Sequence, residues 1–121
     1  MPPAQFIVHN GKQILLMDFS SATSTAEITR MAEEIKKFVA LHQPQSLLGL
    51  VDFTGIRIDR ATTGIIKDMA GHNRKYIRFI ALVGLGSIRS VMLRMMLFLS
   101  GKSNHKVFGT RDKALEWLGY K

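Results

Sequence analysis

Three side chains in the stretch VDFTGIRIDRATTG, residues 51–64, are of types that could do chemistry. Asp52 ends an apolar run typical of a buried strand, and Thr62 and Thr63 place two hydroxyls near the start of a predicted helix. Open α/β sheets bind ligands at the carboxyl ends of their strands, so Asp52 is a candidate ligand-binding residue, or else it braces the next loop. The stretch therefore predicts an active site, a phosphorylation switch or a plain strand–helix junction.

Two segments could hold an anion. A phosphate on Thr62 or Thr63 would gain from the free amides and dipole of the helix N-terminus, and Arg57 and Arg60 could pair with it; alternatively, the threonines only cap the first turn. The second segment, GLGSIR (84–89), follows a predicted strand and opens a predicted helix, so the amides of residues 86–88 with Ser87 and Arg89 could bind an anion. It lacks the third glycine of a dinucleotide-binding turn and the lysine of a P-loop, and a tight turn is the alternative.

The remaining residue types do not favour an enzyme or a metalloprotein. The chain has no cysteine, and its four histidines are scattered without the spacing of metal ligands. There is no G-x-S-x-G stretch of a serine hydrolase. We therefore predict a non-enzymatic protein with no metal site and no cofactor.

The segment VMLRMMLFL, residues 91–99, is apolar on almost every side of a predicted helix. A helix that covers one face of a sheet needs only one apolar stripe, and methionine suits an adaptable contact surface. The excess could be buried within the domain, form a homodimer, meet a membrane surface, or hold a small amphipathic or anionic ligand whose acidic group lies near Arg78 or Arg89. The candidate interface residues are Met92, Met95, Met96 and Phe98.

The composition is that of one globular domain, residues 1–121, with 46% hydrophobic and 21% charged residues. The net charge of +8 comes from residues 54–111, which hold eleven Lys/Arg and two Asp/Glu. This charge permits an anionic partner, or it only forms a solvated surface. Few aromatic residues lie near the basic ones in the sequence, which argues against nucleic acid as the partner. We see neither a secretory signal nor an apolar run long enough for a membrane span, and predict a cytoplasmic protein.

The order of predicted elements is ββαβαβαβα, which indicates a small mixed, mostly parallel sheet of about five strands with four helices. Asn10-Gly11 has the residue types of a hairpin turn, and Ser24 to Glu27 has the spacing of a capping box. We expect Ala61, Ile65, Ile66 and Met69 to form the inner face of the second helix. The predicted strands are 6–9, 14–19, 46–53, 77–83 and 106–108, and the helices begin near Ser24, Asp59, Ser87 and Thr110.

Three stretches together resemble the STAS-like family related to the sporulation anti-sigma-factor antagonist: LVDFTG (50–55), RFIALVG (78–84) and VFGTRDKALEWL (107–118). The resemblance covers nearly the whole chain in element order and implies a compact α/β domain used for regulation or ligand binding, usually without catalysis. It also implies that Thr62, Thr63 and Gly64 match a phosphorylated DSSG motif, although Ala61 stands where that motif has Asp.

We therefore expect a regulatory domain that recognises a partner protein through its second and third helices and the loop of residues 53–60. The alternative is a binder or carrier of a small amphipathic or anionic ligand beside the third helix.

Overall fold

The computed structural model describes residues 2–57, 59–85 and 104–121. Five strands form one sheet in the order β1-β2-β3-β4-β5, with β1 antiparallel to β2 and every other neighbouring pair parallel. The strands are β1 (Ala4–His9), β2 (Lys12–Asp18), β3 (Leu47–Asp52), β4 (Ile77–Val83) and β5 (His105–Phe108). The predicted mostly parallel, mixed sheet is confirmed.

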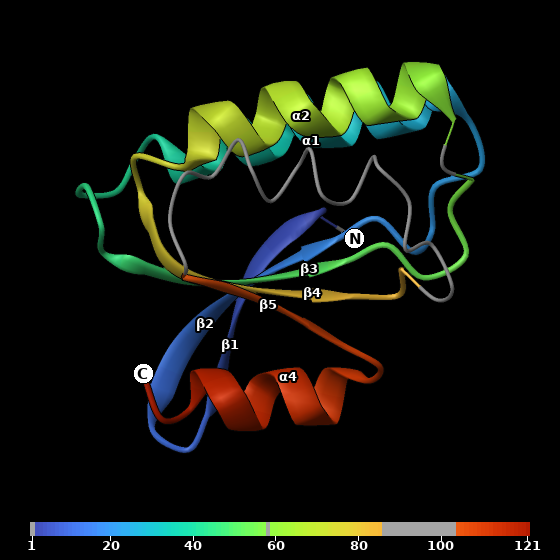
Figure 1. Ribbon diagram of the computed structural model, residues 1–121. Coiled ribbons are helices and arrows are strands. Elements are labelled where there is room, and N and C mark those ends of the chain that lie inside the picture. Colours follow the sequence, from blue (N-terminus) through green and yellow to red (C-terminus); the bar gives the residue numbers. More distant parts are fainter. Residues whose placement is uncertain (1, 58, 86–103) are drawn as a thin grey trace.

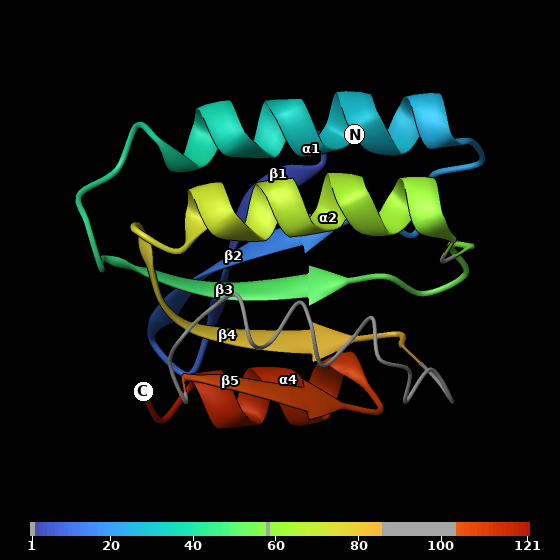
Figure 2. The same ribbon diagram turned by 45° about the horizontal axis from the view of Figure 1, so that its top comes forward.

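Helices cover both faces of this sheet (Figure 1). On one face α1 (Thr25–Val39) and α2 (Arg60–Asn73) lie side by side, as Figure 2 shows, and on the other lies α4 (Arg111–Leu118). The ion pair between Lys36 Nζ of α1 and Asp68 Oδ2 of α2, at 2.7 Å, joins the first two. Three of the four predicted helices are thus present. The remaining one, the third predicted helix near residues 87–99, lies outside the described residues.

Local sequence signals explain the turns and the helix starts. Asn10 and Gly11 have φ angles of 54° and 75°, the left-handed conformation that a two-residue hairpin turn requires. The side chains of Ser24, Asp59 and Thr110 each accept a hydrogen bond from an amide in the first turn of the helix that follows. The capping box at Ser24 is only half formed, because Glu27 bonds to the hydroxyl of Thr23.

Two hydrophobic cores lie on the two sides of the sheet. The larger one, under α1 and α2, contains Phe19 and Phe53, whose stacked rings are 5.6 Å apart. The smaller one, under α4, contains Leu50 and Leu118. All six residues of β3 are buried, as expected for a strand covered on both faces.

The predicted inner face of α2 is partly wrong. Ile66 and Met69 are buried as expected, but Ala61 is exposed and Ile65 is only half-buried. Thr62 and Asn73 are buried in their place. The weak apolar pattern of this glycine- and threonine-containing helix does not define its rotation, which packing against the sheet decides.

Among the described residues, no helix has both the length and the apolar character that crossing a membrane requires.

Candidate functional site

The carboxyl edge of the sheet holds two aspartates joined by one arginine. Asp18 ends β2, Asp52 ends the neighbouring β3, and Arg111 begins α4 directly after β5. Arg111 Nη2 donates to Asp18 Oδ2 at 2.9 Å, and Arg111 Nε donates to Asp52 Oδ2 at 2.6 Å. We call these two ion pairs the Arg111 bridge. They connect α4 to β2 and β3, neither of which pairs with β5, the strand that precedes α4.

The other oxygen of each aspartate is also bonded. Asp52 Oδ1 accepts hydrogen bonds from the backbone amide and the hydroxyl of Thr54, at 2.8 and 2.5 Å. Asp18 Oδ1 accepts from the amide of Ser20 at 2.8 Å. The Asp52 side chain is only 5% exposed. Asp52 was predicted either to bind a ligand or to brace the next loop, and its contacts are those of a brace.

The bridge favours the charged forms of Asp18 and Arg111. Burial opposes ionisation of the Asp18 carboxyl, but hydrogen bonds with Ser20 and Arg111 outweigh it, so its pKa lies below the ordinary value. The hydrogen bond to Asp52, followed by the one to Asp18, raises the pKa of Arg111. A cation in the first turn of a helix is disfavoured by the helix dipole. The two carboxylates therefore account for the position of Arg111.

Sequence reasoning missed Asp18 and Arg111. One signal was available: Asp18 and Asp52 each stand one residue before the end of a predicted strand (14–19 and 46–53), and the carboxyl ends of neighbouring parallel strands lie at one edge of a sheet. The arginine could not be found in the same way, because its contacts depend on where α4 begins relative to β2 and β3.

Thr62 and Thr63 both form hydrogen bonds with Asp59 in the first turn of α2. Asp59 Oδ1 accepts a hydrogen bond from the amide of Thr62 at 2.9 Å, and this bond is the main reason that the pKa of Asp59 is lowered. Thr62 is 1% exposed. Thr63 is half-buried and its Oγ1 donates to the carbonyl of Asp59 at 2.6 Å. Phosphorylation of Thr62 would require the first turn of α2 to open.

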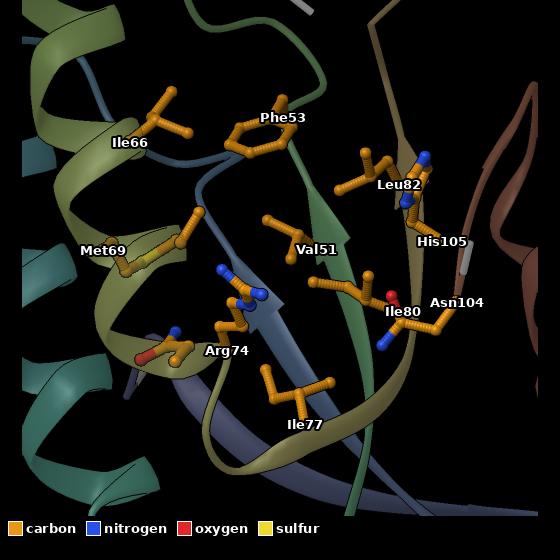
Figure 3. A pocket seen from close by; sticks show the side chains of 12 residues that line it. Val51, Phe53, Ile66, Met69, Arg74, Ile77, Ile80, Leu82, Asn104 and His105 are labelled. Carbon is orange, nitrogen blue, oxygen red and sulfur yellow. The ribbon is translucent and has the colours of Figure 1, made fainter. Parts of the chain in front are cut away.

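A small cavity lies between α2 and the sheet, at the strands β3, β4 and β5. We call it the α2 pocket, and Figure 3 shows the side chains that line it. Its volume is about 60 Å³. The apolar part of its wall includes Val51, Phe53, Ile66, Met69, Ile80 and Leu82. Four polar residues belong to the same wall: Asn73, Arg74, Asn104 and His105.

No protein-family model, curated protein or solved structure matches this chain. The resemblance to the STAS-like family therefore stays an expectation from the sequence.

The other predicted site residues do not gather at one place. Arg57 and Arg60 are exposed near the start of α2. Arg78 lies against the ring of Phe79 and donates to the carbonyl of Lys121, so it is on the α4 side of the sheet and does not line the α2 pocket. Six predicted residues lie outside the described part of the chain: Ser87, Arg89, Met92, Met95, Met96 and Phe98. Within residues 2–57, 59–85 and 104–121, no group of three or more His, Asp or Glu residues could hold a metal ion.

Proposed function

We propose that this chain is a non-enzymatic, STAS-like regulatory domain that acts in the cytoplasm and binds a partner protein through α2, the loop of residues 53–60 and the segment predicted to form the third helix. The observation that supports this proposal most is the composition of the outer face of α2. That face includes Arg60, Gly64, Lys67 and Gly71, whose spacing of three or four residues places them on one side of the helix. Ala61 and Asp68 are exposed beside them, and Asp68 is paired with Lys36 of α1.

Stability does not account for the two glycines on this face. Glycine inside a helix is less stable than alanine by about 0.5–1 kcal/mol. An ideal Cβ at Gly64 or Gly71 would meet no atom of the described residues within 4 Å, so internal packing gives no reason for them. A helix without side chains at these positions lets a partner approach its backbone closely.

The charges around the glycines indicate the chemistry of the partner. Arg60 is exposed, Lys67 is half-buried, and Arg60 forms no ion pair with any residue in the described ranges. Residues 54–111 hold most of the excess positive charge of the chain. The proposed partner therefore presents an acidic surface to α2, because complementary charges steer and orient protein association.

Charge reversal tests this proposal. The double variant Arg60→Glu/Lys67→Glu is expected to lose the partner in affinity capture from an extract of the source cells, followed by mass spectrometry. The matched control is Lys12→Glu/Lys113→Glu, which changes the net charge equally at exposed positions away from α2. Capture of the same partner by wild type and both variants would exclude α2 as the binding face. Its loss from both variants would contradict the proposal differently, because net charge and not the α2 face would then govern capture.

The glycines give a second test, in which stability and binding move in opposite directions. Gly64→Ala should raise the free energy of unfolding by about 0.5–1 kcal/mol and should weaken partner capture, because the added methyl keeps the partner backbone away. Urea unfolding followed by circular dichroism measures the first effect. Thr29→Ala on the exposed side of α1 is the control, since it also favours a helix and should leave capture unchanged. Unimpaired capture by Gly64→Ala would contradict close approach at this position.

A second candidate function is the binding or carriage of a small amphipathic or anionic ligand. The α2 pocket favours it, because an apolar cavity with a few polar groups is the usual form of a small-molecule site. Its polar residues are Asn73, Arg74, Asn104 and His105. Of these, Arg74, Asn104 and His105 replace Arg78 as the candidates for contact with the head of such a ligand.

A further inference from the structure

The α2 pocket has an apolar body and one polar end. Arg74 follows the last residue of α2, and Asn104 and His105 lie at the start of β5. In Figure 3 the Arg74 side chain reaches from α2 toward the middle of the pocket, while Asn104 and His105 border it from the side of β5. Val51, Phe53 and Ile66 supply apolar wall nearer the carboxyl edge of the sheet. A ligand of matching shape has a polar head and a short apolar body.

Asn104 contributes a buried acceptor to this end. Its Nδ2 donates to the carbonyl oxygen of Arg78 at 2.7 Å, which fixes the orientation of the amide. Its Oδ1 is buried and has no hydrogen-bond partner among the described residues. Buried polar atoms are nearly always paired, because an unpaired one loses its hydration without compensation. An unpaired acceptor in a cavity wall therefore indicates that the ligand donates a hydrogen bond.

Arg74 contributes a cation to the same end. A guanidinium has five N–H donors and no acceptor, so Arg74 can bind an anion in addition to the contacts it makes within the chain. Its planar fork matches a carboxylate, with which it can form two parallel hydrogen bonds. The ligand head therefore combines a carboxylate with a hydrogen-bond donor.

The size of the pocket limits the apolar body. A cavity of 150 Å³ binds benzene, and pockets for drug-sized ligands measure about 300–1,000 Å³. The α2 pocket measures about 60 Å³. On the scale set by benzene it fits a group of about two to three carbon atoms, at most the size of a valine side chain, and excludes a long acyl chain.

We propose that the α2 pocket binds a short apolar acid with a hydrogen-bond donor on its α-carbon, that is, an apolar α-hydroxy acid or α-amino acid. The carboxylate pairs with Arg74, the α-substituent donates to Asn104 Oδ1, and the branched alkyl group lies against Ile66, Met69 and Leu82. This inference rests on the second candidate function, because it names the ligand class of that site.

Four probes of similar shape test the proposal by protein-observed NMR titration: 2-hydroxyisovalerate, valine, 3-methylbutanoate and 2-methylpropanol. The first two differ only in the α-donor, and they separate a hydroxy acid from an amino acid as the source of the shared head chemistry. We expect at least one of these two to bind about tenfold or more tightly than 3-methylbutanoate, which lacks the donor. Arg74→Gln should weaken binding of the acids by about tenfold and leave that of the alcohol unchanged, whereas Lys75→Gln, which does not line the pocket, should change neither.

A variant that fills the pocket tests whether the probes bind inside it. Ala70→Leu adds three carbons inside the pocket and should abolish the chemical-shift changes, while Ala61→Leu, at an exposed position of the same helix, should not; unchanged circular dichroism shows that each variant is folded. Equal binding of all four probes would overturn the proposed head chemistry but keep the carrier function. Failure of every probe, or binding that survives Ala70→Leu, would overturn both.

Discussion

Arg111→Met is expected to lower the free energy of unfolding by about 1–3 kcal/mol at pH 7, because it leaves the buried Asp52 carboxylate without its cation. The value is smaller than for a fully buried pair because the Arg111 side chain is 40% exposed and solvent screens it. Methionine keeps the apolar stem of the side chain, so the change removes mainly the guanidinium that bridges Asp18 and Asp52. Asp52 still accepts two hydrogen bonds from Thr54, which keeps the loss at the lower end of values for broken buried pairs. Urea unfolding at pH 7 measures the change.

The size of this effect depends on pH in a defined direction. The pKa of Asp18 is lower in the folded protein than its ordinary value of 3.8, so the stabilisation is complete above that value and is lost as the pH falls through the folded pKa. The difference between wild type and Arg111→Met should thus be constant near neutrality and shrink below about pH 4.

An exposed ion pair provides the control for the Arg111 bridge. Arg30→Met removes the pair with Glu34, whose two side chains are 58% and 48% exposed. Its expected effect is about 0.5 kcal/mol or less, as for other exposed pairs on a helix. If Arg111→Met costs no more than Arg30→Met, the bridge does not hold α4 to the sheet edge.

Gly84→Ala is expected to destabilise the domain by about 3 kcal/mol or more, for two independent reasons. Gly84 directly follows β4 and has a φ of 82°, which is strained for any residue with a Cβ. An ideal Cβ at this position would also lie 2.3 Å from the backbone nitrogen of Thr54, a clash that no side-chain rotation relieves. The midpoint of urea unfolding should fall sharply without a change in the slope.

Gly55→Ala separates the two causes. Gly55 has a φ of 79°, but no atom of the described residues lies within 4 Å of its ideal Cβ. This variant should therefore show only the backbone strain, about 1–2 kcal/mol. Equal losses for the two variants would mean that the added methyl at Gly84 does not clash with Thr54, and that backbone strain alone accounts for both effects.

Much of the architecture is readable from short stretches of sequence. The Asn10-Gly11 turn, the Asp59 cap and the strand Ile77–Val83 were all predicted where they occur. Each depends on residues close together in the chain: left-handed φ angles at a turn, a side chain that meets an amide three residues later, or an apolar run of strand length. The alternation of strands and helices then leaves few arrangements other than a mostly parallel sheet.

The rotation of α2 and the residues that meet at the sheet edge could not be predicted from short stretches of sequence. Adjacent residues on a helix point about 100° apart, so whether Ala61 or Thr62 faces the core depends on how α2 rests on the sheet. Two interpretations of the hydroxyl pair were open, phosphate acceptors or residues that cap the first turn of α2, and the burial of Thr62 and the bond from Thr63 to Asp59 favour the second.

The sequence by itself determined the order of the elements, their caps and turns, the excess of positive charge in residues 54–111, and Asp52 as a residue of interest. Only the tertiary structure decided that Asp52 is bridged by Arg111 to Asp18, and that Arg74 and Asn104 belong to the wall of one apolar pocket. The reason is physical. Arg111 is 59 residues from Asp52 and 93 from Asp18, and such contacts follow from strand order and helix placement, which no local pattern of residues encodes.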